Sequence, residues 1–159
     1  MTSTSDAAPF VVLMAPEWEE AFGEFLLALR ANGDEATFHP HPLTSDQAAS
    51  MARYSGRDLY YLVVDRGRVL AYGMLRGWDE GYEVPSLGIA VDPAERGHGL
   101  GLCLMHFLHF AARERGARAI RLTVSVANRS AIELYERLGY RFEPIGEDEL
   151  LGTLTLEDS

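Results

Sequence analysis

Residues 91–101, VDPAERGHGLG, constrain this chain more than any other stretch. An apolar run precedes them, a helical segment with an apolar stripe follows them, and Gly97, Gly99 and Gly101 stand at alternate positions. Glycine frees the backbone to turn consecutive N–H groups toward one centre, and the first turn of the helix adds unpaired N–H groups and a partial positive charge. The stretch predicts a backbone site for the phosphates of a cofactor, with an ordinary glycine-rich turn as the alternative.

Two common phosphate-binding motifs do not fit this stretch. A P-loop requires a Gly-Lys-Ser/Thr sequence after its first glycine, and no such lysine follows here. A dinucleotide fingerprint requires the spacing Gly-x-Gly-x-x-Gly inside a βαβ unit. The glycines here have a different spacing, and the preceding chain has the pattern of a hairpin.

Two motifs resemble the signatures of the GNAT N-acyltransferases. Arg96–Gly101 (RGHGLG) matches the acyl-CoA loop, Gln/Arg-x-x-Gly-x-Gly/Ala, and residues 128–142 (NRSAIELYERLGYRF) resemble the second signature, Asn-x-x-Ala-x-x-Leu-Tyr-x-x-x-Gly-Phe. Their order and separation also fit, so the resemblance covers residues 59–142, and the chain up to residue 54 fits only loosely. It implies acetyl-CoA as the cofactor.

The pattern of apolar residues predicts an α/β fold. Alternating or continuous apolar runs predict strands at residues 10–14, 59–64, 69–75, 84–91, 119–125, 140–142 and 150–156, and apolar positions three and four apart predict helices at 17–31, from Thr44 or Ser45 to 54, at 100–115 and at 130–138. Pro85 favours an edge or splayed position, and Gly88 could mark a bulge. This order gives a mixed sheet with helices on both faces, which is also the order of the GNAT fold, a mostly antiparallel sheet with two splayed parallel strands.

Length and charge exclude several classes of protein. The chain has 159 residues, a single cysteine and a net charge of −10, which disfavours a nucleic-acid-binding protein and favours a cationic partner. No apolar run reaches the length of about 18 residues that a membrane span needs. Residues 1–9 lack a signal pattern, so we expect a disordered tail at 1–9, one domain at 10–159 and a cytoplasmic location. The sequence does not decide the oligomeric state and allows a homodimer.

The resemblance assigns the cofactor site. It implies that strands 84–91 and 119–125 splay apart and that the pantetheine arm binds along the first of them, at Ile89, Ala90 and Val91. The amide of Ile89 would stabilise the oxyanion. Residues Arg96, Gly97, His98, Gly99, Leu100 and Gly101 would hold the pyrophosphate. Asn128 either contacts the cofactor or only caps the following helix.

The resemblance also suggests an acid and a base. Tyr135 would protonate the leaving thiolate, although Tyr135 also lies on a helical core stripe. Lysine-acetylating relatives carry a glutamate four residues before the oxyanion position, where this chain has Pro85. Glu83 is therefore the first candidate base, directly or through water, and Asp79, Glu80 and Tyr82 follow; each of the acidic residues could instead be a solvated surface charge.

The acceptor would bind near residues 77–82 and 39–42. Trp78 and Tyr82 flank Asp79 and Glu80, so two aromatic rings could stack on a sugar while a carboxylate holds an ammonium group. His39 and His41 could line the same groove, and two histidines without a third ligand do not predict a metal site. The remaining reactive side chains are expected in ordinary roles, Cys103 in the core and His106 and His109 at the surface or an interface.

Three functions follow. The first is transfer of an acetyl group from acetyl-CoA to a small primary amine by direct attack, for which residues 73–82 suggest a nucleotide-linked amino sugar. The second is acetylation of a protein N-terminus or lysine, and the third is a non-catalytic acyl-CoA sensor. A closed pocket would favour the first and an open groove the second.

Overall fold

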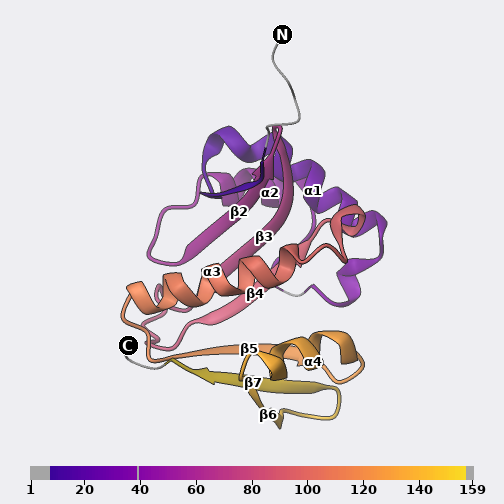
Figure 1. Ribbon diagram of the computed structural model, residues 1–159. Helices are drawn as coiled ribbons and strands as arrows, with labels where there is room; N and C mark the ends of the chain where they lie inside the picture. The colour runs from indigo at the N-terminus through magenta and orange to yellow at the C-terminus, as the bar shows by residue number, and fades with distance from the viewer. Residues whose placement is uncertain (1–7, 39, 157–159) are drawn as a thin grey trace.

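A computed structural model describes residues 8–38 and 40–156 (Figure 1). In this part of the chain, seven strands form one sheet in the order β1-β2-β3-β4-β5-β7-β6. The strands are β1 (Phe10–Leu13), β2 (Leu59–Asp65), β3 (Arg68–Arg76), β4 (Ser86–Val91), β5 (Ala119–Ser125), β6 (Arg141–Pro144) and β7 (Glu149–Thr155). The helices are α1 (Glu19–Ala31), α2 (Ser45–Ala52), α3 (Leu100–Glu114) and α4 (Arg129–Arg137), with 3-10 turns at Pro16–Trp18, Asp34–Ala36 and Pro93–Glu95.

The helices cover both faces of the sheet because the strands of its centre are apolar on both. Along β3, Ala71 and Leu75 pack with α3, whereas Tyr72 and Met74 pack with α1 and α2 on the opposite face. The side chains of α4 join the cluster on the α3 face. We call these two sides the α3 face and the α1 face; in Figure 1, α3 and α4 lie in front of the sheet and α1 and α2 behind it.

The predicted mixed sheet with splayed parallel strands is confirmed. β4 and β5 are neighbours and run parallel, while the other pairs of strands described are antiparallel. β4 and β5 pair only at Ser86 and Arg121, where the Arg121 N–H donates to the Pro85 carbonyl at 3.0 Å, and beyond this point the ribbons diverge (Figure 1). Unpaired backbone groups between the two strands are therefore available to a ligand.

The observed elements begin and end close to the predicted bounds, with two differences around β4. The strand begins at Ser86 instead of residue 84, which places Pro85 just before it. Gly88 makes no bulge: β4 pairs with β3 without a break. A Cβ on Gly88 would lie 3.0 Å from the side chain of Met74, so a larger residue there would require Met74 to shift.

Two predictions on α3 are wrong. Cys103 is exposed, and His109 is buried, with 5% of its surface exposed. The buried side of α3 extends past the predicted apolar stripe to include Met105 and His109, because α3 also packs against Tyr140. The Nε2 atom of His109 lies 2.8 Å from the Tyr140 hydroxyl, so the polar group of each buried ring is satisfied. His106 is exposed, as expected.

None of the helices that the structure describes is both long and apolar enough to cross a membrane.

Candidate active site

Backbone groups of β4 face the gap between the splayed strands. The Pro85 carbonyl accepts a hydrogen bond from β5, and the Asp92 N–H donates to the carbonyl of Leu70 in β3 at 2.9 Å. Because successive residues of a strand point their N–H and C=O groups to opposite sides, the odd-numbered residues of β4 face β5. These are Leu87, Ile89 and Val91, whereas the backbone of Ala90 pairs with Tyr72 of β3.

The loop after β4 has the backbone conformation that its glycines predict. Gly97 and Gly99 adopt left-handed φ angles of 84° and 83°, a conformation that costs other residues energy. Gly99 is the N-cap of α3 and no side chain caps this end, so the first N–H groups of the helix have no partner from a cap. His98 is exposed within the loop, and Leu100 and Gly101 form the first turn of α3. This end of α3 suits an anion.

Arg96 ties this loop to the N-terminal half of the chain. Its Nε donates to the Val91 carbonyl at 3.1 Å, and its guanidinium pairs with the carboxylate of Asp34. Asp92, which is buried, accepts from the Ala94 N–H at 2.9 Å and lies 4.0 Å from a guanidinium nitrogen of Arg68. Neither Asp34 nor Asp92 stands out in the sequence, because no periodic pattern marks a partner distant in sequence.

Asn128 caps α4. Its Oδ1 accepts from the Ala131 N–H at 3.3 Å and from the Ser130 hydroxyl at 3.4 Å. Asn128 therefore caps the helix through its side-chain oxygen, Oδ1. Its side-chain nitrogen, Nδ2, takes no part in the cap. Asn128 itself is exposed, at the end of β5 nearest the gap.

Tyr135 lies on the side of α4 that faces the sheet. Its ring centre is 5.7 Å from that of Tyr140 and 6.5 Å from that of Phe142, and burial raises the pKa of its hydroxyl. Within the described residues, no hydrogen bond uses this hydroxyl. Tyr135 is therefore held as a neutral phenol that can donate a proton.

Asp58 and Tyr54 organise the turn between β3 and β4. The Oδ1 atom of Asp58 accepts from the N–H groups of Gly77, Trp78 and Asp79 at 3.0, 2.9 and 3.2 Å. Asp79 in turn accepts from the Tyr54 hydroxyl and from the Arg57 N–H, and these bonds, chiefly that from Tyr54, lower its pKa. Hydrogen bonds to Asp58 and from Tyr54 thus hold the turn in place, and neither residue was a candidate from the sequence.

The expectation that Trp78 binds the acceptor is wrong. Trp78 is buried, with 6% of its surface exposed, and belongs to the cluster on the α3 face. The guanidinium of Arg115 covers its ring at 4.7 Å. The Asp58 contacts fix the turn so that Trp78 points into the core, while Tyr82 is 59% exposed.

A cavity of about 390 Å³ lies where the splay begins. Its polar lining residues are Arg76, Glu80, Tyr82, Ser86, Arg121 and Thr123, and its apolar lining residues include Pro40, Met74, Val84 and Leu87. Glu80 and Tyr82 are predicted acceptor residues that the structure brings together here. Glu83 is exposed and is not part of this lining, and neither is Asp79.

His41 lies beside this cavity and its ring is already engaged. The Pro42 carbonyl, which can only accept, is 2.8 Å from Nδ1, so Nδ1 carries the proton and Nε2 accepts from the Tyr72 hydroxyl at 3.0 Å. Burial lowers the pKa of His41. His39 lies outside the described residues. Among those described, no group of three or more His, Cys, Asp or Glu side chains could hold a metal ion.

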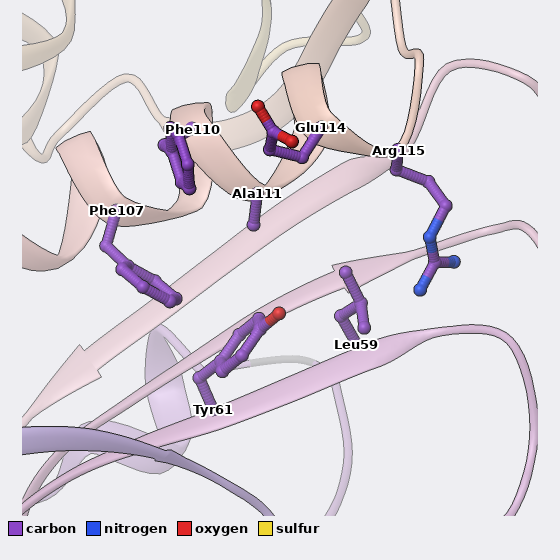
Figure 2. A pocket seen from close by; sticks show the side chains of 7 residues that line it. All are labelled: Leu59, Tyr61, Phe107, Phe110, Ala111, Glu114 and Arg115. Carbon is purple, nitrogen blue, oxygen red and sulfur yellow. The ribbon is translucent and has the colours of Figure 1, made fainter.

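A second cavity, of about 360 Å³, lies on the α3 face between α3 and β2 (Figure 2). It is lined by Leu59, Tyr61, Phe107, Phe110, Ala111, Glu114 and Arg115. Tyr61 and Phe107 meet edge to face with ring centres 4.9 Å apart. No predicted site residue borders this cavity, so we place the candidate site at the splay.

Several solved structures share this fold. The crystal structure of the ribosomal-protein-S18-alanine N-acetyltransferase from Escherichia coli matches with a TM-score of 0.73 and 22% identity, over 96% of each chain. A GCN5-related N-acetyltransferase from Kribbella flavida matches with a TM-score of 0.76 and 26% identity, over 94% of this chain and 98% of that one. The acetyltransferase yncA from Salmonella typhimurium, solved with acetyl-CoA, has a TM-score of 0.74 and 20% identity, over 96% of each chain.

Sequence relatives have related names. The chain is 30% identical over 106 residues to the [ribosomal protein bS18]-alanine N-acetyltransferase of Escherichia coli K12, covering 67% of this chain and 69% of that protein. It is 29% identical over 124 residues to the mycothiol acetyltransferase of Rhodococcus jostii, covering 70% of this chain and 40% of that protein. An uncharacterised N-acetyltransferase of Methanocaldococcus jannaschii, MJ1207, is 46% identical over 52 residues, or 33% of this chain and 23% of that protein. The chain thus spans less than half the length of the last two.

The model of the acetyltransferase (GNAT) family matches residues 17–140, which include the loop after β4, both splayed strands and Tyr135. The chain therefore belongs to the GNAT acetyltransferase family.

Proposed function

We propose that this protein transfers an acetyl group from acetyl-CoA to the primary amine of a small molecule. The observation that supports this is the cavity at the beginning of the splay, whose volume of about 390 Å³ is within the range of small-molecule sites. The cavity opens beside the β4 backbone that would hold the thioester. The predicted cytoplasmic location, single domain at residues 10–159 and homodimer remain predictions.

In this proposal the two faces of the sheet have separate roles. The N–H of Ile89, which faces β5, would stabilise the oxyanion formed when the amine attacks. The pyrophosphate would bind at the loop from Gly97 to Gly101 and the first turn of α3. On the α3 face Tyr135 would donate its proton to the thiolate of CoA as the carbon–sulfur bond breaks.

We propose Glu80 as the base, ahead of Glu83. Glu80 lines the cavity and Glu83 does not. Asp79 is a weaker base than an ordinary carboxylate because the bonds from Tyr54 and Arg57 lower its pKa. The amine arrives as an ammonium ion and must lose a proton before it attacks, directly to Glu80 or through water.

The matched pair Glu80→Gln and Glu83→Gln tests this assignment. Glu80→Gln should lower kcat/KM, most at low pH, where free amine is scarce, and less as the pH approaches the pKa of the amine. Glu83→Gln should leave the pH–rate profile unchanged, and the reverse result would restore Glu83 as the base.

Acetyl-CoA turnover tests the function itself. Release of CoA thiol is measured with amino sugars, nucleotide-linked amino sugars, other small amines and a peptide with an N-terminal alanine. We expect turnover with small amines. Turnover with the peptide alone would favour the activity named for the Escherichia coli relative, and CoA binding without turnover would favour a sensor. The amino-sugar prediction now depends on Tyr82 alone for stacking, since Trp78 is buried.

A further inference from the structure

Three polar residues form a row across the sheet at the floor of the cavity. Arg76 of β3 pairs in register with Ser86 of β4, and Ser86 pairs in register with Arg121 of β5. All three line the cavity at the splay. On β5 the neighbours of Arg121 in sequence, Ile120 and Leu122, are buried in the cluster on the α3 face, so alternation points Arg121 toward the α1 face. We call Arg76, Ser86 and Arg121 the arginine row.

The two guanidinium groups of this row have no carboxylate partner. Within residues 8–38 and 40–156, five of the fourteen arginines lie within 4.0 Å of a carboxylate, namely Arg30, Arg53, Arg66, Arg68 and Arg96, and Arg76 and Arg121 are among the nine that do not. Arg76 donates only to the Pro40 carbonyl, at 3.2 Å, and Arg121 has no side-chain partner in the described chain. The protein carries a net charge of −10, so two unpaired cations in one cavity are not a consequence of a basic surface.

The position of the arginine row separates it from the predicted pyrophosphate site. Ser86 begins β4 and Val91 ends it, and at about 3.3 Å per residue the two ends lie about 17 Å apart. The pyrophosphate loop follows Val91. Ile89, at the predicted oxyanion position, is three residues from Ser86, about 10 Å along the strand. The row is therefore beside the acceptor and away from the phosphates of CoA.

We propose that the acceptor carries an oxyanion group, a carboxylate or a phosphate, in addition to the amine that is acetylated. This inference rests on the proposed function, because it takes the cavity as the acceptor site. A planar guanidinium binds a carboxylate or phosphate through two parallel hydrogen bonds, and the Ser86 hydroxyl can donate a third. Glu80, which also lines the cavity, is left for the ammonium group. A polyamine, which is cationic at both ends, is disfavoured.

Binding to the CoA-saturated protein tests the proposal without requiring turnover. Titration calorimetry compares two matched pairs of amines: glucosamine 6-phosphate with glucosamine, and an amino acid, β-alanine, with its amide, β-alaninamide, which has no carboxylate. We expect the more anionic member of at least one pair to bind about 10-fold more tightly, the scale of hydrogen bonds to a charged group. The first pair identifies a phosphate as the anion and the second a carboxylate. Equal affinities within both pairs would overturn the proposal.

Charge variants identify the groups responsible. Arg121→Gln and Arg76→Gln should each remove most of the preference for the anionic member. Arg118→Gln is the matched control: it makes the same change in net charge one residue before β5, at an exposed position outside the cavity. If the preference survives in both Arg121→Gln and Arg76→Gln, or disappears equally in Arg118→Gln, the arginine row is not the anion site. If this protein binds anionic amines through the arginine row but releases no CoA thiol, the result would contradict the proposed acetyl transfer and support the anion site.

Discussion

At the scale of single residues, the hydroxyl of Tyr135, which is partly buried, is the group to which we assign the most specific chemistry. Burial raises its pKa above the ordinary value for tyrosine, which favours the protonated form. A general acid needs this property when the leaving group is a thiolate of lower pKa. Its ring also packs beside Tyr140 and Phe142. Tyr135 therefore has both a packing role and a proposed catalytic role, and an experiment must separate the two.

Tyr135→Phe separates them because it removes the hydroxyl and keeps the ring. We expect kcat to fall by about 100-fold, the scale of general-acid catalysis, with little change in Tm. Steady-state kinetics and thermal denaturation of the same preparation provide the two readouts. Tyr140→Phe is the control: it removes a neighbouring hydroxyl, so it should lower Tm by freeing His109 while kcat stays within a few-fold. Wild-type kcat in Tyr135→Phe would return the residue to a packing role.

His109 makes folding sensitive to acid. Burial, with smaller effects from His106 and Arg113, lowers its pKa to about 4, while the unfolded chain has the ordinary value of about 6.5. The unfolded state therefore binds a proton first, and the stabilisation present above pH 6.5 is lost as the pH falls toward 4. His41, whose pKa burial also lowers, acts in the same direction.

His109→Gln should flatten this dependence. Glutamine can still accept from the Tyr140 hydroxyl and does not titrate. Chemical denaturation at several pH values between 7 and about 4 should show a smaller fall in the free energy of unfolding than in the wild type, by on the order of 1 kcal/mol. Equal slopes would mean that the pKa of His109 is the same in the folded and the unfolded protein.

At the scale of elements, the sequence predicted most of the fold because short-range patterns determine it. The hairpin between β2 and β3 follows from Arg66-Gly67, both with positive φ, a two-residue turn suited to the twist of the strands. Thr44 begins α2 by accepting from the Gln47 N–H. Side-chain direction was harder: Trp78 faces the core because Asp58, 20 residues away, fixes its turn, and no local pattern contains that information. The same holds for Arg96 with Asp34.

The site was predictable only where a family motif or a backbone group defines it. The glycine loop, the direction of Ile89 and the helix of Tyr135 depend on local geometry. The arginine row depends on the register of β3, β4 and β5, of which β5 is distant in sequence from the other two, so Arg76 and Arg121 were not candidates until the pairing was known.

Gly99→Glu tests the loop as an element. A carboxylate at the N-terminus of α3 would occupy the anion site, so CoA affinity measured by calorimetry should fall below detection. Gly99 has a φ of 83°, so the substitution also costs about 1 kcal/mol of stability. Gly116→Glu at the other end of α3 has the same strain, with a φ of 90° and open space around it. Gly116→Glu should change Tm as much as Gly99→Glu does and keep wild-type CoA affinity. An equal loss of affinity in both variants would contradict the assignment of the loop as the pyrophosphate site.

At the scale of the whole molecule, the proposed reaction would be divided between the two faces of the sheet. The cavity with the arginine row opens on the α1 face, and Tyr135 belongs to the cluster on the α3 face. The splay of β4 and β5 is the connection between them (Figure 1). In the proposed reaction, an amine approaching from the α1 face would add to the thioester carbon and form the oxyanion, and the thiolate would then leave toward Tyr135 on the α3 face with both substrates bound.

This geometry predicts a ternary complex and no acetylated enzyme. Initial rates measured against acetyl-CoA at several acceptor concentrations should give intersecting reciprocal plots, whereas an acyl-enzyme would give parallel ones. The nucleophile that such an intermediate would favour is the single cysteine, Cys103, which is exposed on α3 and outside the cavity. Cys103→Ser should therefore keep the wild-type rate, and mass spectrometry of the protein mixed with acetyl-CoA alone should show no added acetyl group. Parallel plots together with an acetyl group on the protein would contradict direct attack and require a nucleophile within reach of Ile89.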